Sequence, residues 1–281
     1  MIMNKKARNF IGYGLLYTGM IFFGFVAMLP FVWMVRSSFM EIKQIFLMPP
    51  RWIPEPFTVN NFTQAFHQTH ILRNMGNTLY VVIMNIIGVE LTSSMAAYAF
   101  SRVHWKGRDT IFAVLLSAMM LPGTVTLIPV YIGWSKVGGI DTYWPLILGA
   151  FLGGGAYNIF LMRQFFLTIP HELDEAAFID GASRFRIYWN IDIPLAKSSL
   201  IVVGLFTFMG TWNDFMGPLL YINNLNKQTV AVALQSLLGK YTSQWNIIMA
   251  ASVIVTLPCF FIFLIGQKYI VGGIALSGIK G

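Results

Sequence analysis

The sequence predicts an all-α membrane protein with six transmembrane helices and one charged cytoplasmic loop built as helix, turn and helix. The chain is 56% hydrophobic and only 11% charged over 281 residues, whereas a soluble domain has about 25% charged residues. Its apolar residues gather in runs of about 20, the length that crosses a bilayer as a helix. One charged segment with helix-breaking residues separates two of these runs, and it must lie outside the lipid.

The six apolar runs cover residues 11–35, 75–100, 110–132, 144–163, 195–220 and 246–266. The first exceeds the apolar core of about 7–15 residues found in signal peptides, and no A-x-A site follows it, so we expect an uncleaved anchor. Residues 36–74 are expected to form an irregular external loop with one short helix near residues 60–66, because prolines surround Trp52. We expect one transmembrane domain over residues 1–281, with residues 171–195 as a loop within it.

The distribution of positive charge predicts the orientation. With the N-terminus inside, the cytoplasmic segments hold 12 Lys and Arg residues and the external segments hold 7. Because cytoplasmic loops carry the excess of positive charge, both termini and the loop at residues 171–195 are expected in the cytoplasm. The net charge of +8 is then a mark of orientation, and no nucleic-acid partner is expected.

The loop begins with a helix signal and a turn signal. Pro170 suits a helix start, and Glu172, Asp174 and Glu175 place negative charge at the positive end of the helix dipole. Gly181 can adopt the positive φ that ends a helix and turns the chain. These residues predict a short helix that ends near Gly181.

A second short helix is predicted over about residues 183–190. Phe185 and Trp189 stand four residues apart and therefore share one of its faces. Pro194 suits the first turn of the fifth span. A helix, a glycine turn and a second helix with apolar anchors would fit a groove on a soluble partner.

The spacing within this loop is specific. Glu175-Ala176-Ala177 is followed after three residues by Gly181 and after nine more by Ile191-x-Ile193-Pro194. This pattern resembles the cytoplasmic loop of the membrane subunits of ABC importers, EAA-x3-G-x9-I-x-L-P, with Ile193 in place of Leu as the one departure.

The resemblance extends to most of the chain and points to the MalG-like permeases of carbohydrate importers. It rests on Arg163-Gln-Phe-Phe, Asp180-Gly-Ala-Ser, Trp212-Asn213-Asp214-Phe215, Pro218-Leu219 and Gly278-Ile279-Lys280-Gly281. It implies the type I ABC importer permease fold, a bacterial inner-membrane location and a carbohydrate substrate, with an oligosaccharide favoured. The implied partners are a second related permease, two cytoplasmic ATPase subunits and an external solute-binding protein.

In that family the loop inserts into a cleft of the ATPase. The resemblance therefore assigns ATPase coupling to Glu172, Glu175, Ala176, Ala177, Asp180, Gly181, Phe185 and Pro194.

No ATP site, catalytic residue or metal site is predicted in this chain. The pattern G-x-x-x-x-G-K-[ST] is absent, since Gly239-Lys240 precedes a tyrosine and lacks the upstream glycine. ATP and Mg²⁺ are expected to bind the partner ATPase. The four histidines, His67, His70, His104 and His171, lie scattered in loops without the spacing of metal ligands.

Polar residues inside the spans mark a candidate substrate path. A charge at the bilayer centre costs about 2.5–3.5 kcal/mol on the insertion scale and therefore normally faces protein or water. Glu90 and Asp214 are the deepest carboxylates, and Trp212 and Asn213 beside Asp214 are residue types that bind sugars. The candidate path is thus Glu90, Trp212, Asn213 and Asp214. The alternative is that these groups make interhelical hydrogen bonds or lie at the outer interface.

Two other functions stay open at this stage. An ion-coupled secondary sugar transporter would use Glu90 and Asp214 as its coupling carboxylates, but it gives no reason for the docking loop. A membrane scaffold that only recruits an ATPase would explain the loop and leave the intramembrane polar residues without a role.

Overall fold

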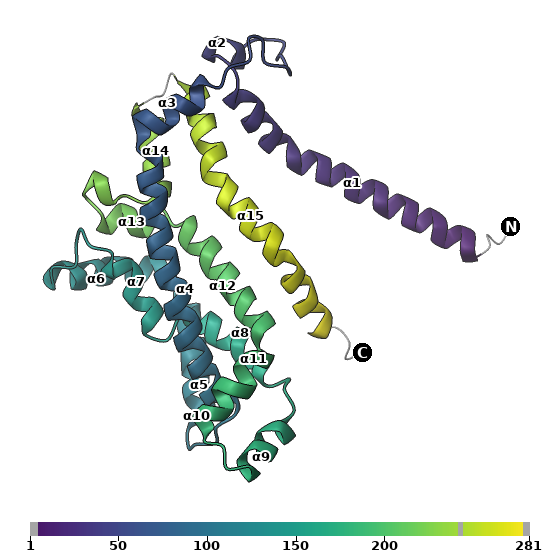
Figure 1. Ribbon diagram of the computed structural model, residues 1–281, viewed down its shortest axis with the longest axis vertical. Coiled ribbons are helices and arrows are strands. Elements are labelled where there is room, and N and C mark those ends of the chain that lie inside the picture. Colours follow the sequence, from purple (N-terminus) through teal and green to yellow (C-terminus); the bar gives the residue numbers. More distant parts are fainter. Residues whose placement is uncertain (1–4, 241–243, 278–281) are drawn as a thin grey trace. The chain divides into compact units, whose positions relative to one another are not determined.

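The structure, a computed structural model, describes residues 5–240 and 244–277, and this part of the chain is helical with no β-strand (Figure 1). It divides into two compact units. One comprises the chain up to His70 together with residues 236–254. The other comprises residues 71–235 together with the chain from Val255 onward.

The first unit contains the long helix α1 (Lys5–Ser38) and two short helices, α2 (Ile42–Ile45) and α3 (Asn60–Thr69). It also takes the end of α14 (Val230–Lys240) and the start of α15 (Trp245–Ser277). The side-chain amide of Asn61 donates to the carbonyls of Ser38 and Met40, both at 2.8 Å, and accepts from Asn246 at 2.7 Å. The short helix expected in the external loop is therefore present as α3, and its first turn fastens the loop.

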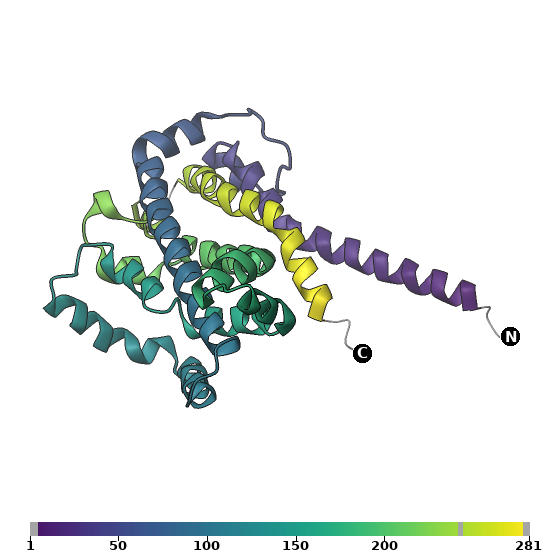
Figure 2. The ribbon, with the colours of Figure 1, turned by 60° about the horizontal axis from the view of Figure 1, so that its bottom comes forward.

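The second unit is built around α4 (Ile71–Ser101). The elements that follow it are α5 (Arg108–Ser117), η1 (Ala118–Met120), α6 (Gly123–Lys136), α7 (Trp144–Phe151), α8 (Ala156–Phe166), α9 (His171–Ile179), α10 (Arg184–Ile187), η2 (Tyr188–Asp192), α11 (Ile193–Leu195), α12 (Lys197–Trp212), α13 (Met216–Tyr221) and η3 (Leu225–Lys227). The helices α4 and α12 run side by side (Figure 2). The loop helices α9 and α10 lie at the end of α4 where Ser101 is (Figure 1).

Close approach and polar bonds hold α4 against its neighbours. A Cβ on Gly88 would lie 2.9 Å from the Cβ of Ala150, so α4 and α7 meet where α4 has no side chain. The Asn85 amide donates to the carbonyl of Leu146 at 3.0 Å, and the Thr92 hydroxyl donates to that of Ala150 at 2.8 Å. Lipid tails are as apolar as leucine, so membrane helices associate through such packing and polar contacts.

The predicted spans are confirmed as apolar helices, although two of them are bent. Four candidate spans cover Gly12–Ser38, Ile71–Ser101, Trp144–Phe166 and Trp245–Ile270, and two bent pairs raise the number to as many as six. The span Trp144–Phe166 is interrupted between α7 and α8. The run predicted at 110–132 breaks between α5–η1 and α6 with a bend of 96°. Leu121 and Pro122 are extended there, because proline donates no hydrogen bond and disfavours helix in the residue before it.

Candidate functional site

The first helix of the loop at residues 171–195 ends in a Schellman turn. After α9, Gly181 adopts φ of +80°. Its N–H donates to the carbonyl of Phe178 at 3.0 Å, and the N–H of Ala182 donates to that of Ala177 at 2.9 Å, which is the paired bonding that defines this helix end. A Cβ at Gly181 would meet nothing within 4 Å. Glycine is therefore required by the backbone conformation and not by crowding.

The second half of the loop starts with a side-chain cap. The Ser183 hydroxyl accepts from the N–H of Arg186 at 3.3 Å, which satisfies a donor at the start of α10. The helix predicted at 183–190 is present, but it continues as the π-helical turn η2 and as α11. Within it Ile187 and Tyr188 are buried.

The outer face of the loop is exposed and apolar. We define it by four side chains, whose exposed fractions run from 45% to 86%: Phe178, Ile179, Phe185 and Trp189. They flank Gly181 on both sides in the sequence. Exposed large apolar side chains in a charged, extramembrane loop are typical of a protein-binding surface.

The residues predicted to couple to the ATPase divide between the two faces of the loop. The exposed ones are Glu172, Glu175, Ala176, Asp180, Gly181, Phe185 and Pro194. Ala177 is buried and so faces the interior of this chain. Sequence reasoning did not select Phe178 and Ile179, although two apolar residues directly before a helix-ending glycine could have indicated them.

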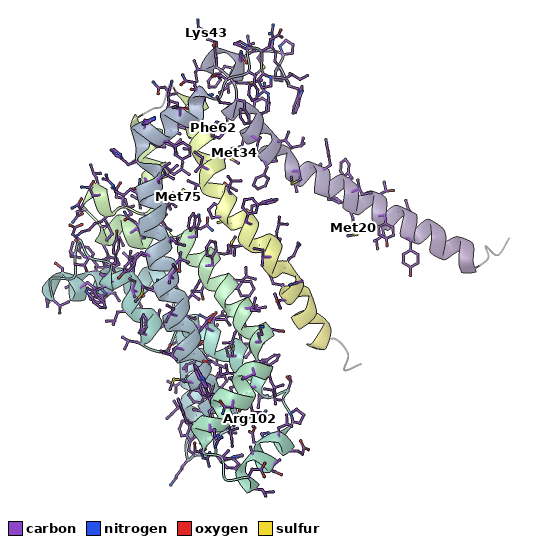
Figure 3. The ribbon with its side chains drawn as sticks, in the orientation of Figure 1. Met20, Met34, Lys43, Phe62, Met75 and Arg102 are labelled. Atoms are coloured by element: carbon purple, nitrogen blue, oxygen red, sulfur yellow. The ribbon has the colours of Figure 1, made fainter. Side chains whose placement is uncertain are left out.

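The inner face of the loop is held by a buried ion cluster that sequence reasoning missed. Arg102 follows α4 directly and lies among the loop helices (Figure 3). Its Nε is 3.7 Å from a carboxylate oxygen of Asp174 on α9 and 3.7 Å from one of Asp192 in η2. Its Nη2 donates to the carbonyl of Ile169 at 2.8 Å, and its Nη1 is 3.0 Å from His171 Nδ1. In the sequence, Arg102 is one of several charges in a loop and Asp174 is an acidic residue at the start of a helix. Asp192 stands at a position of the motif that any residue can occupy.

Burial sets the electrostatics of this cluster. The Asp192 side chain is fully buried and that of Arg102 nearly so. The pKa of Asp192 is raised to about 6, mainly by burial and also by the nearby Asp174 carboxylate, while Arg102 acts in the opposite direction. Two carboxylates thus share one guanidinium away from water.

The four residues of the candidate substrate path occupy different environments. Glu90 on α4 faces α12 where Gly204 has no side chain, because a Cβ there would lie 2.5 Å from Glu90 Oε1. Trp212 is only 3% exposed. Its Nε1 donates to the carbonyl of Val255 at 3.2 Å, and its ring stacks on Phe208 with centroids 5.5 Å apart. Trp212 therefore packs within the protein.

Asn213 and Asp214 lie at a break between α12 and α13, so the run predicted at 195–220 is interrupted. The exposed Asn213 amide donates to the carbonyl of Met209 at 2.8 Å. The Asp214 carboxylate accepts from the N–H of Gly217 at 3.2 Å and so satisfies a free donor in the first turn of α13. Interrupted helices leave backbone and side-chain polar groups at membrane depth, where they must face protein or a water-filled cavity.

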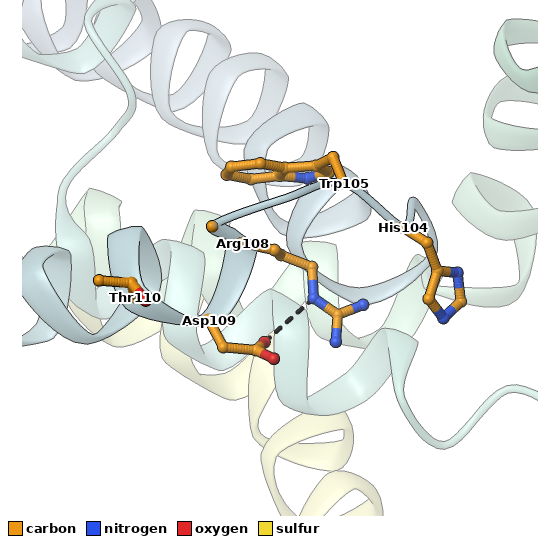
Figure 4. Close-up of a pocket in the computed structure, with 6 residues that line it drawn as sticks. His104, Trp105, Arg108, Asp109 and Thr110 are labelled. Carbon is orange, nitrogen blue, oxygen red and sulfur yellow. Dashed lines mark hydrogen bonds and ion pairs between the residues drawn. The ribbon is translucent and has the colours of Figure 1, made fainter.

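A separate open pocket lies between α4 and α5 (Figure 4). Its lining residues are His104, Trp105, Gly107, Arg108, Asp109 and Thr110. The guanidinium of Arg108 donates to Asp109 at 3.0 Å, and this bond is the main reason that the pKa of Asp109 lies below its usual value. Because these charges pair with each other, we assign the pocket no ligand.

Metal binding has no support in the described residues. Among residues 5–240 and 244–277, no three His, Cys, Asp or Glu side chains cluster closely enough to hold a metal ion.

A helical membrane domain whose loop exposes apolar side chains is typical of the membrane-embedded subunit of a larger assembly. Comparison with known proteins identifies the assembly. The chain belongs to the family described as binding-protein-dependent transport system inner membrane component, whose model matches residues 88–275. It is thus a permease subunit of an ABC importer.

Individual relatives agree with this assignment. The arabinooligosaccharides transport system permease protein AraQ of Halalkalibacterium halodurans is 29% identical, over 99% of this chain and all of AraQ. The inner membrane ABC transporter permease protein YcjP of Escherichia coli is also 29% identical, over the full length of both chains. A chain from the crystal structure of a bacterial importer of the acidic polysaccharide alginate superimposes with a TM-score of 0.82. The superposition covers 96% of this chain and 99% of the alginate importer chain, at 20% sequence identity. It confirms the fold.

Proposed function

We propose that this chain forms half of the translocation path of an ATP-driven importer for an oligosaccharide. The observation that carries the proposal is the exposed apolar outer face of the loop at residues 171–195, which is suited to a groove on a cytoplasmic partner. The substrate class is supported by the relatives, one of which is named for arabinooligosaccharides and another for alginate import.

The assembly comprises a second related permease, two cytoplasmic ATPase subunits and an external solute-binding protein. The ATPase subunits bind ATP and Mg²⁺ and perform the hydrolysis, since this sequence has no phosphate-binding loop. The chain lies in the inner membrane with both termini in the cytoplasm, as the charge ratio of 12 to 7 supports.

The mechanism is alternating access. ATP binding closes the ATPase pair, the docked loops of the two permeases move with it, and the spans change from inward-open to outward-open. This chain does no covalent chemistry. Asn213 and Asp214 offer polar groups to sugar hydroxyls at the α12–α13 break, with Glu90 deeper in the membrane and Trp212 supporting the break from within.

The test is uptake by the reconstituted complex in liposomes. Arabino- and alginate oligosaccharides are supplied with the external binding protein, with ATP inside the liposomes or without it. Uptake that requires ATP supports the proposal. Uptake driven by an ion gradient without ATP would establish a secondary transporter, and ATP hydrolysis without any sugar flux would establish a scaffold.

A further inference from the structure

Three polar residues form a stripe on α4 that faces the cytoplasmic loop. Ser94, Tyr98 and Arg102 follow one another at intervals of four residues, and such positions share one face of a helix. Arg102 lies just beyond the last residue of α4, but its N–H still donates to the carbonyl of Tyr98 at 2.8 Å. The stripe therefore belongs to one continuous helical segment.

Each residue of the stripe contacts a different part of the loop. The hydroxyls of Ser94 and Tyr188 are 2.8 Å apart in a buried bond. The Tyr98 hydroxyl donates to the carbonyl of Arg184 at 3.1 Å, and its ring is 5.2 Å from that of Tyr188. Thus α10 and η2, which carry half of the outer face, are tied to α4 at two successive turns.

Arg102 connects the first half of the loop, α9, to the second half. It is equidistant from Asp174 on α9 and Asp192 in η2, so one side chain joins the helices before and after the Gly181 turn. A buried charge is costly when it loses its partner. A planar guanidinium can serve several acceptors at once, which a lysine cannot do equally well.

The same face of α4 leads into the membrane. Glu90 is one turn before Ser94, and the Ser94 hydroxyl also donates to the carbonyl of Glu90. The Glu90 carboxylate in turn occupies the space beside Gly204 of α12. The stripe and this contact therefore form a continuous series of contacts from the loop through α4 to α12.

We propose that the Ser94–Tyr98–Arg102 stripe transmits the movement of the ATPase-docked loop to α4, with Arg102 as the positioning residue that makes α9 and η2 move as one body. The inference rests on the proposed function, because it takes the loop to be docked on an ATPase. It differs from a purely folding role in one measurable respect. Loss of the contacts between the loop and α4 lowers the amount of sugar transported per ATP hydrolysed. A misfolded loop instead lowers the rates of sugar uptake and of ATP hydrolysis together.

The test compares variants in the complete reconstituted importer. Sugar uptake, ATP hydrolysis and the amount of bound ATPase are measured on the same liposomes. Arg102→Gln is expected to lower the sugar-to-ATP ratio about 2- to 30-fold, the range found for residues that carry coupling. Arg102→Lys keeps the charge and should recover part of the loss. Lys106→Gln removes a charge from an exposed side chain of the same short segment and should match the wild type.

A second set of variants covers the case in which Arg102→Gln does not assemble. Tyr188→Phe breaks the bond between Ser94 and Tyr188, and Ser94→Ala breaks this bond and the one to Glu90. Both should lower the ratio, and the double variant should match Ser94→Ala, because effects on one shared interaction do not add.

The outcomes separate the two proposals. If the wild type couples uptake to ATP but Arg102→Gln and the Ser94–Tyr188 variants keep its ratio, the stripe proposal is wrong and the proposed function stands. The stripe proposal is equally wrong if uptake and hydrolysis fall in proportion. If the wild type shows no ATP-dependent uptake, the proposed function itself fails, and the stripe proposal fails with it.

Discussion

The loop at residues 171–195 and the break between α12 and α13 are both polar interruptions of an apolar chain, but they are held in different ways. The loop is tied down by residues far away in the sequence, since the bonds from Ser94 and Tyr98 span 94 and 86 positions. At the break, the bonds from Asn213 to Met209 and from Gly217 to Asp214 span only four and three positions. The long-range bonds there are those of Trp212 to Val255 and of Asn213 to Cys259. Distant ties make the loop one body with α4. If Asn213 and Asp214 contact the sugar as proposed, their local bonds can be exchanged for a ligand without unfolding the helices around the break.

The comparison requires that the loop lies in the cytoplasm, and labelling gives an all-or-none test. In a Cys259→Ala background, a cysteine at Ser183 should react with an impermeant thiol reagent only from the cytoplasmic side. A cysteine at Asn60 should react only from the outside. Reaction of both from the outside would contradict the predicted topology and remove the contrast between the two regions.

Disruption of the loop turn should have the largest effect on activity. Gly181→Leu forces a branched side chain into positive φ, which costs about 1–3 kcal/mol, and distorts the surface between Phe178 and Phe185. We expect sugar uptake to fall at least about tenfold. Gly76→Leu is a matched control, since Gly76 lies within α4, has no close neighbours and does not have positive φ. Normal uptake and ATPase binding by Gly181→Leu would disprove the docking role.

Changes at the break should affect sugar handling without affecting assembly. Asn213→Ala removes a polar group that would bond a sugar hydroxyl, a loss worth about 1–3 kcal/mol, so uptake should fall while the amount of assembled complex stays constant. Asn60→Ala, an exposed asparagine elsewhere, is the control.

Trp212→Phe sharpens the same test. It deletes the bond to Val255 inside the protein and should lower the free energy of unfolding by about 1 kcal/mol, without a specific loss of sugar uptake. Loss of assembly in Asn213→Ala, or unchanged uptake, would take Asn213 out of the path.

The smallest expected effect is the contribution of the loop to the pH dependence of protein stability. The pKa of Asp192 in the folded protein, about 6, lies above its usual value of 3.8. Between these values the folded state binds more protons than the unfolded state, so the contribution of this group to the free energy of unfolding increases as the pH falls from about 6 to 4. The charged and polar groups that face Asp192 are Asp174, Arg102 and His171, and both proteins in the comparison keep them. The measurement is therefore the difference in thermal stability between wild type and Asp192→Asn at pH 7 and at pH 5.

Asparagine mimics the protonated carboxyl, so the variant should be the more stable protein at pH 7, and the difference should shrink at pH 5. A difference that is the same at both pH values would show that Asp192 does not titrate in this range.

Sequence reasoning performed best where physical rules act over a few residues. Apolar runs located the spans, since crossing a bilayer requires about 20 apolar residues whatever their neighbours are. The turn at Gly181 was predictable because positive φ favours glycine. The break at Pro122 was not predicted, although the proline was visible, because the length of the run at 110–132 outweighed it.

The sequence by itself determined the helical membrane class, the family resemblance of the loop and the exposure of Phe185, because each depends on composition or on spacing within one segment. Only the tertiary structure decided which side of the loop faces inward. The pairing of Arg102 with Asp174 and Asp192, and the bond between Ser94 and Tyr188, join positions up to 94 residues apart. Trp212 likewise became an internal packing residue only through its contact with Val255. Such pairs are fixed by how whole helices pack against one another, and no local pattern in one sequence encodes that packing.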